Sequence, residues 1–456
     1  VDASDVYDGA KRVTLKPSAG LNAYASYRLI VDSGLKSAAG EAILTGKVIR
    51  IRTGLDTSDK FPQISDEELL TKVQQQTFRY FWEGAEPTSG MARERTSSGA
   101  TVTTGGTGFG VMAMTVAAER GFVTRSEACQ RVQRIVTFLA ERATSYHGAF
   151  SHWIDGQTGQ TLPFSADDNG ADLVETGLLF QGLLTARAYF DGADAAESKL
   201  RADITALWEA VEWDFFTKEG TEKVLYWHWS PDKGWAMNMP IQGWNEALIV
   251  YVLAASSPTH PIGREVYAEG WARGGAMRNG KLFYDTVLPL GEDYGGPLFW
   301  AQYSFLGLNP RGLSDAYADY WEQVCNHTRI NYAYCVDNPK GYAGYGADCW
   351  GLTASDIPDG YTASSPTNDR GVIAPTAALS SMPYTPDESM AALRFFYYKL
   401  GDKLWSDYGF IDAFDLTTGW FDRGMHIAID QGPIVVMIEN YRTGLPWNLF
   451  MSDKDV

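Results

Sequence analysis

The sequence has little of what marks several common classes of protein. Its 456 residues include four cysteines, and no two of them have Cys-x-x-Cys spacing, which excludes a zinc ribbon. The six histidines form no His-Glu-x-x-His motif or other ligand spacing. We therefore expect no metal and no cofactor. Cys129 is expected to be a buried free thiol, and one disulfide among Cys325, Cys335 and Cys349 is left open.

Long apolar runs and an excess of positive charge are also absent. No run approaches the ~18 apolar residues that span a bilayer. The 38 basic residues against 56 acidic ones give a net charge of −18, which argues against binding to a phosphate backbone. We expect no nucleic-acid partner, no transmembrane segment and a monomer. The first residue is Val rather than Met, which predicts that a leader has been removed.

Aromatic residues, in contrast, are abundant. They make up 13% of the chain and include 15 tryptophans, many of them beside Gly, Asp or Asn. A loop tryptophan near carboxylates suits a polar ligand with apolar faces, such as a sugar ring. The best stacking candidates are in Trp227-His228-Trp229 and Gly419-Trp420-Phe421. Packing of these rings in the core or at a rim is the open alternative.

Residues 1–60 differ in pattern from the rest of the chain. The segments 11–17, 27–32 and 46–53 alternate polar and apolar residues and are separated by Ser, Gly and Asn turns. This alternation is typical of strands with one buried face. We predict a small all-β sandwich over 1–60, joined by a linker near 55–62 to a second domain over 61–456.

The second domain has the pattern of helices. Ser65-Asp66-Glu67-Glu68 has the form of a capping box, which marks a helix start. Apolar periodicity then predicts about twelve helices. They are expected at 65–83, 106–120, 125–144, 171–190, 196–214, 242–255, 261–273, 296–307, 313–330, 371–381, 386–401 and 431–442.

The connections between these predicted helices alternate in length. Each even-numbered helix is followed by about five or six residues, and each odd-numbered helix by roughly 20 to 40, a length usually associated with function. This alternation predicts a mainly α, (α/α)6 toroid over 61–456. Even-numbered helices would lie inside, and the long loops would share one rim. An open array of helical hairpins is the alternative.

Three carboxylates lie close together at the start of one predicted apolar helix. Asp168, Asp172 and Glu175 are spaced i, i+4 and i+7, so a continuous helix would place them on one face over about 10 Å. Helix capping explains Asp168 and perhaps Asp172. It does not explain Glu175, which favours a functional acid cluster. The sequence names these three residues and Glu246, which we place in the first turn of the next inner helix beside Trp244, as catalytic candidates.

Further polar and aromatic residues fall near the starts of the predicted inner helices or in the long loops. If the ring closes, those at the helix starts converge on one acidic cleft. Turn or cap roles are the alternative for each of the acids, and Glu439 is also expected to pair with an arginine. The substrate-binding candidates are Trp227, Trp229, Trp244, Asn245, Asp293, Trp350, Asp369, Arg370, Trp420, Asp430 and Glu439.

A cleft of carboxylates without a metal pattern or a Ser-His-Asp signal indicates acid–base chemistry. Glycoside hydrolysis needs two carboxyl groups, one to protonate the leaving oxygen and one to activate water or attack the sugar. Crowded like charges raise the pKa of an acid, which suits the proton donor. The sequence therefore predicts a glycoside hydrolase.

Several motifs in order give the chain a resemblance to a known family. They are Gln75–Glu83, Thr103–Gly110, Gly170–Thr176, Gly243-Trp244-Asn245-Glu246 and Ile434–Gly444. Together they resemble the glycoamylase-like domain of bacterial glycoside hydrolase family 144 over about residues 65–450. The first 60 residues are similar to the later strands of a bacterial Ig-like module.

The resemblance implies an (α/α)6 toroid that hydrolyses β-1,2-glucan with inversion, either within the chain or by releasing sophorose from an end. It maps the family's acidic trio onto Asp168, Asp172 and Glu175, and its later functional Glu onto Glu246. It also implies a periplasmic or outer-membrane location. The alternatives are a hydrolase of α-1,4-glucan, a carbohydrate-binding protein of a glycan-uptake system without turnover and, ranked lower because the cleft is acidic, a polysaccharide lyase.

Overall fold

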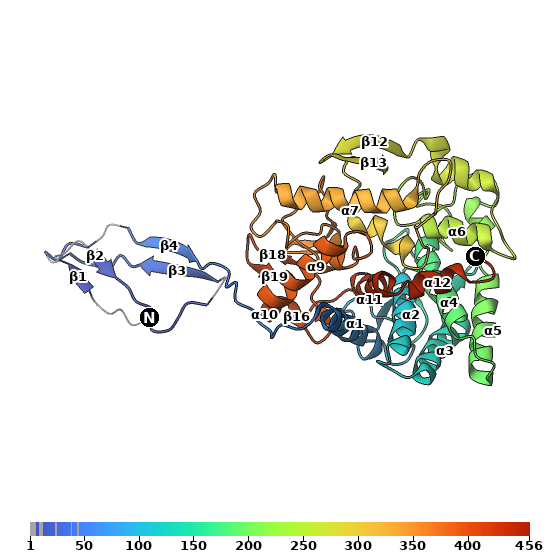
Figure 1. Cartoon of the computed structure of the whole chain (residues 1–456), viewed down its shortest axis with the longest axis horizontal. Helices are drawn as coiled ribbons and strands as arrows, with labels where there is room; N and C mark the ends of the chain where they lie inside the picture. The colour runs from blue at the N-terminus through green and yellow to red at the C-terminus, as the bar shows by residue number, and fades with distance from the viewer. Residues whose placement is uncertain (1–5, 9–11, 23–24, 38, 43–44) are drawn as a thin grey trace.

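The computed structural model describes residues 1–456 apart from 1–5, 9–11, 23–24, 38 and 43–44. Its first part consists of short strands: β1 (Val6–Asp8), β2 (Arg12–Thr14), β3 (Ser26–Val31) and β4 (Lys47–Arg52). β1 pairs with β2 and β3 with β4, in two separate antiparallel sheets. Figure 1 shows both hairpins to one side of the helical body. Every side chain of β4 is exposed, so the sandwich stays a prediction.

Helices dominate the chain from Asp66 onward (Figure 1). The α-helices are α1 (Asp66–Trp82), α2 (Thr104–Glu119), α3 (Arg125–Glu141), α4 (Leu173–Tyr189), α5 (Ala195–Glu209), α6 (Leu248–Ser256), α7 (Tyr320–Asp337), α8 (Pro375–Leu379), α9 (Pro386–Arg394), α10 (Gly401–Leu404), α11 (Ala428–Arg442) and α12 (Leu445–Met451). Shorter 3₁₀ or π segments are η1 (Trp213–Thr217), η2 (Val266–Trp271), η3 (Arg273–Gly275), η4 (Leu298–Ala301), η5 (Tyr303–Phe305) and η6 (Phe395–Lys399).

Short strands occupy the long connections between helices. They are β5 (Thr101–Thr103), β6 (Ser145–Tyr146), β7 (Ala149–Phe150), β8 (Trp153–Asp155), β9 (Thr161–Leu162), β10 (Ala171–Asp172), β11 (His228–Trp229), β12 (Arg278–Phe283), β13 (Thr286–Leu290), β14 (Ala354–Ile357), β15 (Gly360–Ala363), β16 (Trp405–Ser406), β17 (Gly409–Phe410), β18 (Phe414–Asp415) and β19 (Trp420–Phe421). Most pair as hairpins, whereas β10 pairs with β11 across the two intervening helices α4 and α5.

The first five predicted helices agree with α1 to α5 to within a few residues, apart from the end of the fifth. Local hydrogen bonds explain their starts: Ser65 and Thr124 form capping boxes with Glu68 and Glu127, and such boxes satisfy N–H groups that a helix end leaves open. The prediction for 171–190 begins too early, because Asp172 adopts an extended conformation and caps α4. The three acids therefore do not share one helix face.

The later predictions are less accurate. In place of the helices predicted at 261–273 and 296–307, the structure has the short segments η2 to η5. The ninth predicted helix is displaced, since α7 ends at Asp337. The prediction of 242–255 is also wrong at its start, because Gly243 has a φ of 79° and α6 begins at Leu248. Glu246 thus precedes the helix instead of lying in its first turn.

Six elements contact one another in a closed series. α2 packs against α4 and α11, α4 packs against α6, α6 contacts η5, and α8 packs against α11. The remaining step runs through Gln302, between η4 and η5, whose amide donates to the carbonyl oxygen of Ala377 in α8 at 3.0 Å. Except for η5, which directly follows η4, each of these elements comes after a long connection. The helices α1, α3 and α5 contact α11, α2 and α4, respectively. The connections before α2, α4 and α6 contribute the site described below.

The crossing of α2 and α4 is unusually tight. A Cβ added at Gly108 would lie 2.3 Å from the carbonyl oxygen of Leu178, and one added at Gly182 would lie 2.1 Å from that of Gly108. Side chains cannot occupy such positions, so the two helix backbones approach each other through glycine. This close contact places the first turn of α2 beside Glu175.

The interior is formed by aromatic and aliphatic residues from all the helices, and the largest fully buried side chains include Trp208, Trp213 and Trp350. All four cysteines are buried and free, so the open disulfide is not formed. No helix within the described residues combines the length and the apolar character needed to cross a membrane.

Candidate active site

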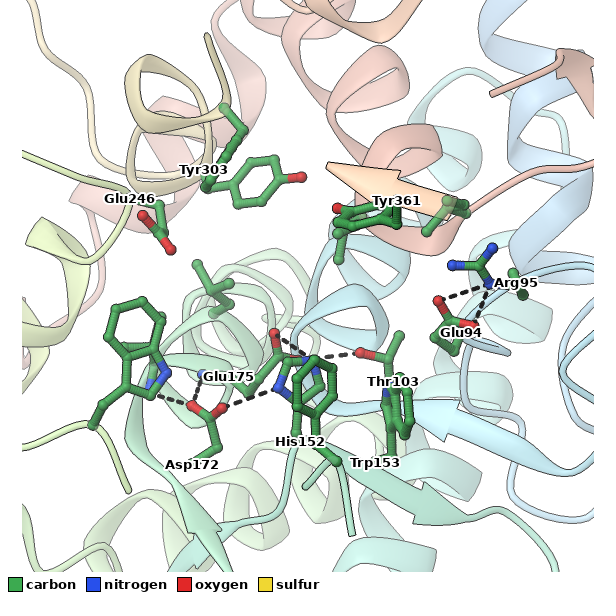
Figure 2. Close-up of a pocket in the computed structure, with 17 residues that line it drawn as sticks. Glu94, Arg95, Thr103, His152, Trp153, Asp172, Glu175, Glu246, Tyr303 and Tyr361 are labelled. Atoms are coloured by element: carbon green, nitrogen blue, oxygen red, sulfur yellow. Dashed lines mark hydrogen bonds and ion pairs between the residues drawn. The ribbon is translucent and has the colours of Figure 1, made fainter. Parts of the chain in front are cut away.

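A cavity of about 370 Å³ lies where the connections before α2, α4 and α6 meet. Its walls carry both apolar rings and carboxyl groups (Figure 2). The lining residues are Glu94, Arg95, Thr103, His152, Trp153, Phe164, Asp172, Val174, Glu175, Leu178, Trp227, Glu246, Phe299, Tyr303, Tyr361, Ile427 and Ile429. A concave site with a few convergent polar groups is the usual form of a binding site for a small ligand.

Asp172 is held by the start of α4. Its Oδ1 accepts the backbone N–H groups of Val174 and Glu175, each at 2.9 Å, and its Oδ2 lies 3.2 Å from Nδ1 of His152. Burial raises the pKa of this carboxyl, but the hydrogen bond from His152, the charges of His228 and His152 and the backbone N–H of Glu175 together lower the pKa. Asp172 is therefore an ionised side chain with both oxygens engaged.

Glu175 crosses from α4 to the first turn of α2. Its Oε2 accepts the N–H of Gly105 at 2.6 Å and the hydroxyl of Thr103 at 3.1 Å. Its Oε1 faces Nε2 of His152 at 3.9 Å. Burial raises the pKa of Glu175, and the positive charge of His152 opposes that rise. Of the two acids on this wall, Glu175 has the less engaged oxygen.

His152 lies between these two acids. It comes from the connection before β8, and its ring stacks on Phe164 with a centroid distance of 4.4 Å. Burial lowers its pKa, but the charge of Glu175 and the hydrogen bond with Asp172 raise the pKa to about 9. An imidazolium at this place keeps negative charge on its neighbours in a partly enclosed cavity.

Asp168 is close to this group but lies outside the cavity lining. Its Oδ2 is 3.4 Å from Nε2 of His228. Burial and the charge of Asp172 raise the pKa of Asp168 to about 7, whereas burial lowers the pKa of His228. We call Asp168, Asp172 and Glu175 the first acidic cluster.

Glu246 stands on the opposite side of the cavity from the first acidic cluster (Figure 2). Among the described residues, no other side chain hydrogen-bonds or ion-pairs with its carboxyl group. Burial raises its pKa to about 7, and the charges of Asp172 and Glu175 add to the effect. Glu246 is thus an acid that still carries its proton near neutral pH. The bend that precedes α6 is fixed by Asn245, whose side chain accepts the N–H of Ala247 at 2.9 Å.

The arrangement separates a proton donor from a proton acceptor. Glu246 faces the cavity with a pKa raised to about 7, whereas Asp172, whose pKa is lowered, and Glu175 flank the imidazolium of His152. Groups whose environments drive their pKa values apart are the usual partners in acid–base catalysis. The aromatic rings of Trp153, Phe164 and Trp227 offer apolar faces in the same cavity.

Comparisons with known proteins show which family the chain belongs to. Residues 238–454 match the model of the Glycoamylase family, described as "Putative glucoamylase". The crystal structure of an endo-β-1,2-glucanase from Chitinophaga pinensis, in complex with sophorotriose and glucose, is 51% identical. It superposes with a TM-score of 0.84 over 86% of this chain and 96% of that one. The chain belongs to the Glycoamylase family.

Two further matches come from Parabacteroides distasonis. An exo β-1,2-glucooligosaccharide sophorohydrolase acting at the non-reducing end is 48% identical over 414 residues, which are 86% of this chain and 57% of that protein. The crystal structure of a β-1,2-glucanase is 45% identical and covers 92% of this chain and 62% of that one, with a TM-score of 0.84. The chain thus spans somewhat more than half the length of the curated relative.

Of the predicted site residues, the structure brings Asp172, Glu175, Glu246 and Trp227 to the lining of one cavity. Trp229 is not part of that lining and packs edge-on against His147. Trp244 is almost fully buried, and its indole N–H donates to Nδ1 of His327 at 3.3 Å.

Other candidates lie away from the cavity lining of this Glycoamylase member. Trp350 is corrected: it is completely buried, and its N–H donates to the carbonyl oxygen of Glu388, so it has no face open to a sugar. Glu439 pairs with Arg120 at 2.7 Å, as the expected ion pair with an arginine requires, and this contact lies in a different pocket. It is therefore corrected as a substrate-binding candidate.

The remaining candidates are found on loops or in the interior. Asp293 forms an exposed ion pair with Lys281, Asp369 accepts the hydroxyls of Tyr334 and Tyr345, and Arg370 is exposed. Trp420 lies in β19, partly exposed and outside the cavity. Asp430 is buried next to Asp412.

Sequence reasoning missed several residues of the cavity. They include His152, Thr103, Tyr303, Tyr361, Glu94 and Arg95. A signal existed for His152, because it is one of six histidines and stands beside Trp153 in a loop. The sequence contains no such signal for the others, since their role depends on which connections meet.

Proposed function

We propose that this member of the Glycoamylase family is a glycoside hydrolase that cleaves β-1,2-linked glucan or its oligosaccharides. The observation that carries the proposal is a pair of carboxyl groups on facing walls of one cavity: Glu246, whose pKa is raised to about 7, and Glu175, which lies beside the imidazolium of His152. The names of the relatives support the choice of linkage. In the same proposal, the closed series of helices is an (α/α)6 toroid, the family is glycoside hydrolase family 144, and the location is periplasmic or at the outer membrane.

The mechanism follows from the two walls. Glu246 donates its proton to the glycosidic oxygen as the bond breaks, and Glu175 removes a proton from the attacking water. His152 keeps Glu175 negative, and Asp172 holds His152 in place. Direct attack by water would invert the configuration at the anomeric carbon. The aromatic rings of Trp153 and Trp227 would contact the apolar faces of the sugar rings.

The first experiment is to incubate the protein with linear β-1,2-glucan and, separately, with soluble starch, and to chromatograph the products over time. We expect products from β-1,2-glucan alone. Sophorose from the outset would identify attack at a chain end, and a ladder of shortening oligosaccharides would identify attack within the chain. Glucose from starch would overturn the substrate assignment. Binding of β-1,2-glucan without product would instead favour a carbohydrate-binding protein.

The stereochemistry has its own measurement. Proton NMR of the first product formed distinguishes the α-anomer, which inversion of a β-linkage gives, from the β-anomer, which retention gives. The Glu246→Gln protein serves as the control for uncatalysed hydrolysis. A β-anomeric first product would contradict the assignment of Glu175 as a base and favour it as a nucleophile.

A further inference from the structure

Four aspartates that are separated along the chain meet behind the part of the cavity wall that Arg95 and Ile429 line. Asp356 belongs to β14, Asp412 lies between β17 and β18, Asp422 follows β19, and Asp430 lies in the first turn of α11. We call them the second acidic cluster. The residue before Asp430, Ile429, lines the cavity, and so does Arg95, which pairs with Asp356.

These carboxyl groups are buried without enough partners. Asp412 and Asp430 are each 1% exposed and Asp356 is 8% exposed. Oδ2 of Asp412 accepts the N–H of Asp356 at 2.8 Å. The other oxygen of Asp412, Oδ1, is buried without a hydrogen-bond donor, and the same holds for Oδ2 of Asp422 and Oδ2 of Asp430. Within the cluster, the carboxyl groups of Asp412 and Asp430 face each other, as do those of Asp356 and Asp422. Orphaned buried carboxylate oxygens are rare and indicate a bound proton, water or ion.

Positive charge near the cluster is scarce. Arg95 lies 2.8 Å from a carboxylate oxygen of Asp356, and it also pairs with Glu94 at 2.8 Å. One guanidinium therefore serves two acids and contacts none of the other three aspartates in the described structure. Burial raises the pKa of Asp412 and of Asp422 to about 7, and burial with the charge of Asp412 raises the pKa of Asp430 well above its usual value. The charged forms of these groups lack compensation.

The spacing of the oxygens matches a hard cation. One carboxylate oxygen from each of Asp356, Asp412 and Asp422 can be chosen so that all three lie within 4.8 Å of one another. Calcium binds oxygen ligands at about 2.3–2.6 Å, so two ligands on opposite sides of the ion are up to about 5 Å apart. Calcium also tolerates irregular geometry and takes six to eight oxygens, which suits ligands from several loops.

A comparison within the molecule strengthens the point. His152, Asp168 and Asp172 have a similar spacing, but there the acids already face histidines at 3.2 and 3.4 Å. In the second acidic cluster Arg95 pairs with Asp356 alone, and the other three aspartates each keep an oxygen without a donor. We propose that Asp356, Asp412 and Asp422 bind one calcium ion, with Asp430 as a neighbouring acceptor. The ion would join β14, the two ends of the β18–β19 hairpin and α11 behind the cavity wall.

Calcium binding can be tested on the full chain without any substrate. The protein is stripped with a chelator, dialysed and titrated with CaCl₂ or MgCl₂ in a calorimeter, and its melting temperature is followed in parallel. We expect one calcium per chain with a dissociation constant of about 10⁻³ M or tighter. We also expect a rise in melting temperature of about 2 °C or more at saturation. Neither readout depends on the proposed hydrolase activity.

Two variants and a matched control locate the site. Asp412→Asn and Asp422→Asn should each weaken calcium binding by about tenfold or more, since a carboxylate ligand becomes neutral. Asp315→Asn is the control, because Asp315 joins Tyr267 and Tyr320 in another region, and it should bind calcium as the wild type does. Circular dichroism confirms folding, and partly exposed Asp422 provides the test if Asp412→Asn does not fold.

Three results would overturn the proposal. The first is the absence of both heat and thermal shift at about 10 mM calcium, a concentration above the weakest known sites; shared protons would then explain the cluster. The second is equal calcium binding by both variants and the wild type. The third is tighter binding of magnesium than of calcium, which would exclude calcium as the ion.

Discussion

The first and second acidic clusters lie near the same cavity, and the charges of their acids are compensated differently. In the first, two histidines and the backbone N–H groups at the starts of α2 and α4 surround the acids. In the second, one arginine meets one of four aspartates, and three oxygens have no hydrogen-bond donor. Both clusters are buried, so exposure does not explain the difference.

The difference teaches which cluster can carry out chemistry. An acid next to an imidazolium stays charged and can still gain or lose a proton, which is what a base must do. An acid among other acids in a dry interior must take up a proton or a cation before it becomes stable. We therefore assign catalysis to the first cluster with Glu246, and ion binding to the second.

The largest effect should come from Glu246→Gln. The amide keeps the size of the side chain but cannot donate the proton, so kcat on β-1,2-glucan should fall about 10²- to 10⁴-fold. Glu212→Gln is a matched control, since Glu212 is a partly exposed acid paired with His147 outside the cavity. Reducing ends released per minute measure both. Equal rates for Glu246→Gln and wild type, with the fold intact, would refute the site.

The next effect separates members of the first cluster. Glu175→Gln should lower kcat by about 10²-fold, because the base is lost. Asp168→Asn should cost less than about tenfold, because Asp168 lies outside the cavity lining and acts through His228. Initial rates of the two purified variants decide the order. A larger loss in Asp168→Asn would move the base from Glu175 to Asp168.

A smaller effect, visible mainly in the pH profile, is expected for His152→Gln. The wild-type kcat/KM should fall as the pH rises through about 7, where Glu246 loses its proton. Loss of the imidazolium raises the pKa of Glu175, so the acidic limb moves to higher pH while the alkaline limb stays.

Because the pKa of His152 is raised to about 9, its ion pairs stabilise the fold fully below the unfolded pKa of about 6.5 and are lost as the pH rises through about 9.

His147→Gln is the control for that profile, because His147 also pairs with a glutamate but lies outside the cavity. It should leave both limbs unchanged. An unshifted acidic limb in His152→Gln would show that His152 does not set the charge of Glu175.

The smallest effect concerns the second cluster and is seen in stability. In calcium-free buffer, Asp412 has a pKa raised from 3.8 to about 7. The free energy of unfolding should therefore be largest below the unfolded pKa and decrease as the pH rises through about 7. An amide does not titrate, so Asp412→Asn should reduce this dependence. Urea unfolding at about pH 5 and about pH 8 measures it. An unchanged dependence would place the proton elsewhere.

Much of this comparison was within reach of the sequence, and some was not. Asp172, Glu175 and Glu246 could be named as candidates because carboxylates stand at the starts of predicted apolar helices, and Trp227 because it is a tryptophan in a predicted loop. The prediction that the three acids share one helix face is wrong, since Asp172 caps α4 and Asp168 lies in the loop before it. Helical periodicity does not reveal where an extended residue ends the pattern.

The second cluster could not be predicted as a group, although Asp430 was a substrate-binding candidate on its own. Its members lie in β14, at the two ends of the β18–β19 hairpin and in α11, so no spacing along the chain marks them as ligands. The expectation of no metal was drawn from such spacings, and it therefore says little about ligands that only the fold brings together. The same holds for Arg95, which reaches the cavity because Arg95 and Ile427 pair as an isolated bridge.

The glycine contact between α2 and α4 has a consequence for how this protein can vary. The distance between the helices is set by positions without side chains, and that distance holds Gly105 N–H on Glu175. A side chain added at Gly108 or Gly182 would push α2 and α4 apart and move Glu175 away from the N–H of Gly105. Residues that do not contact a substrate are thus among those that should tolerate substitution least. A mutational scan restricted to the cavity would overlook them, whereas a scan of the whole chain should find activity lost there without any change in the lining.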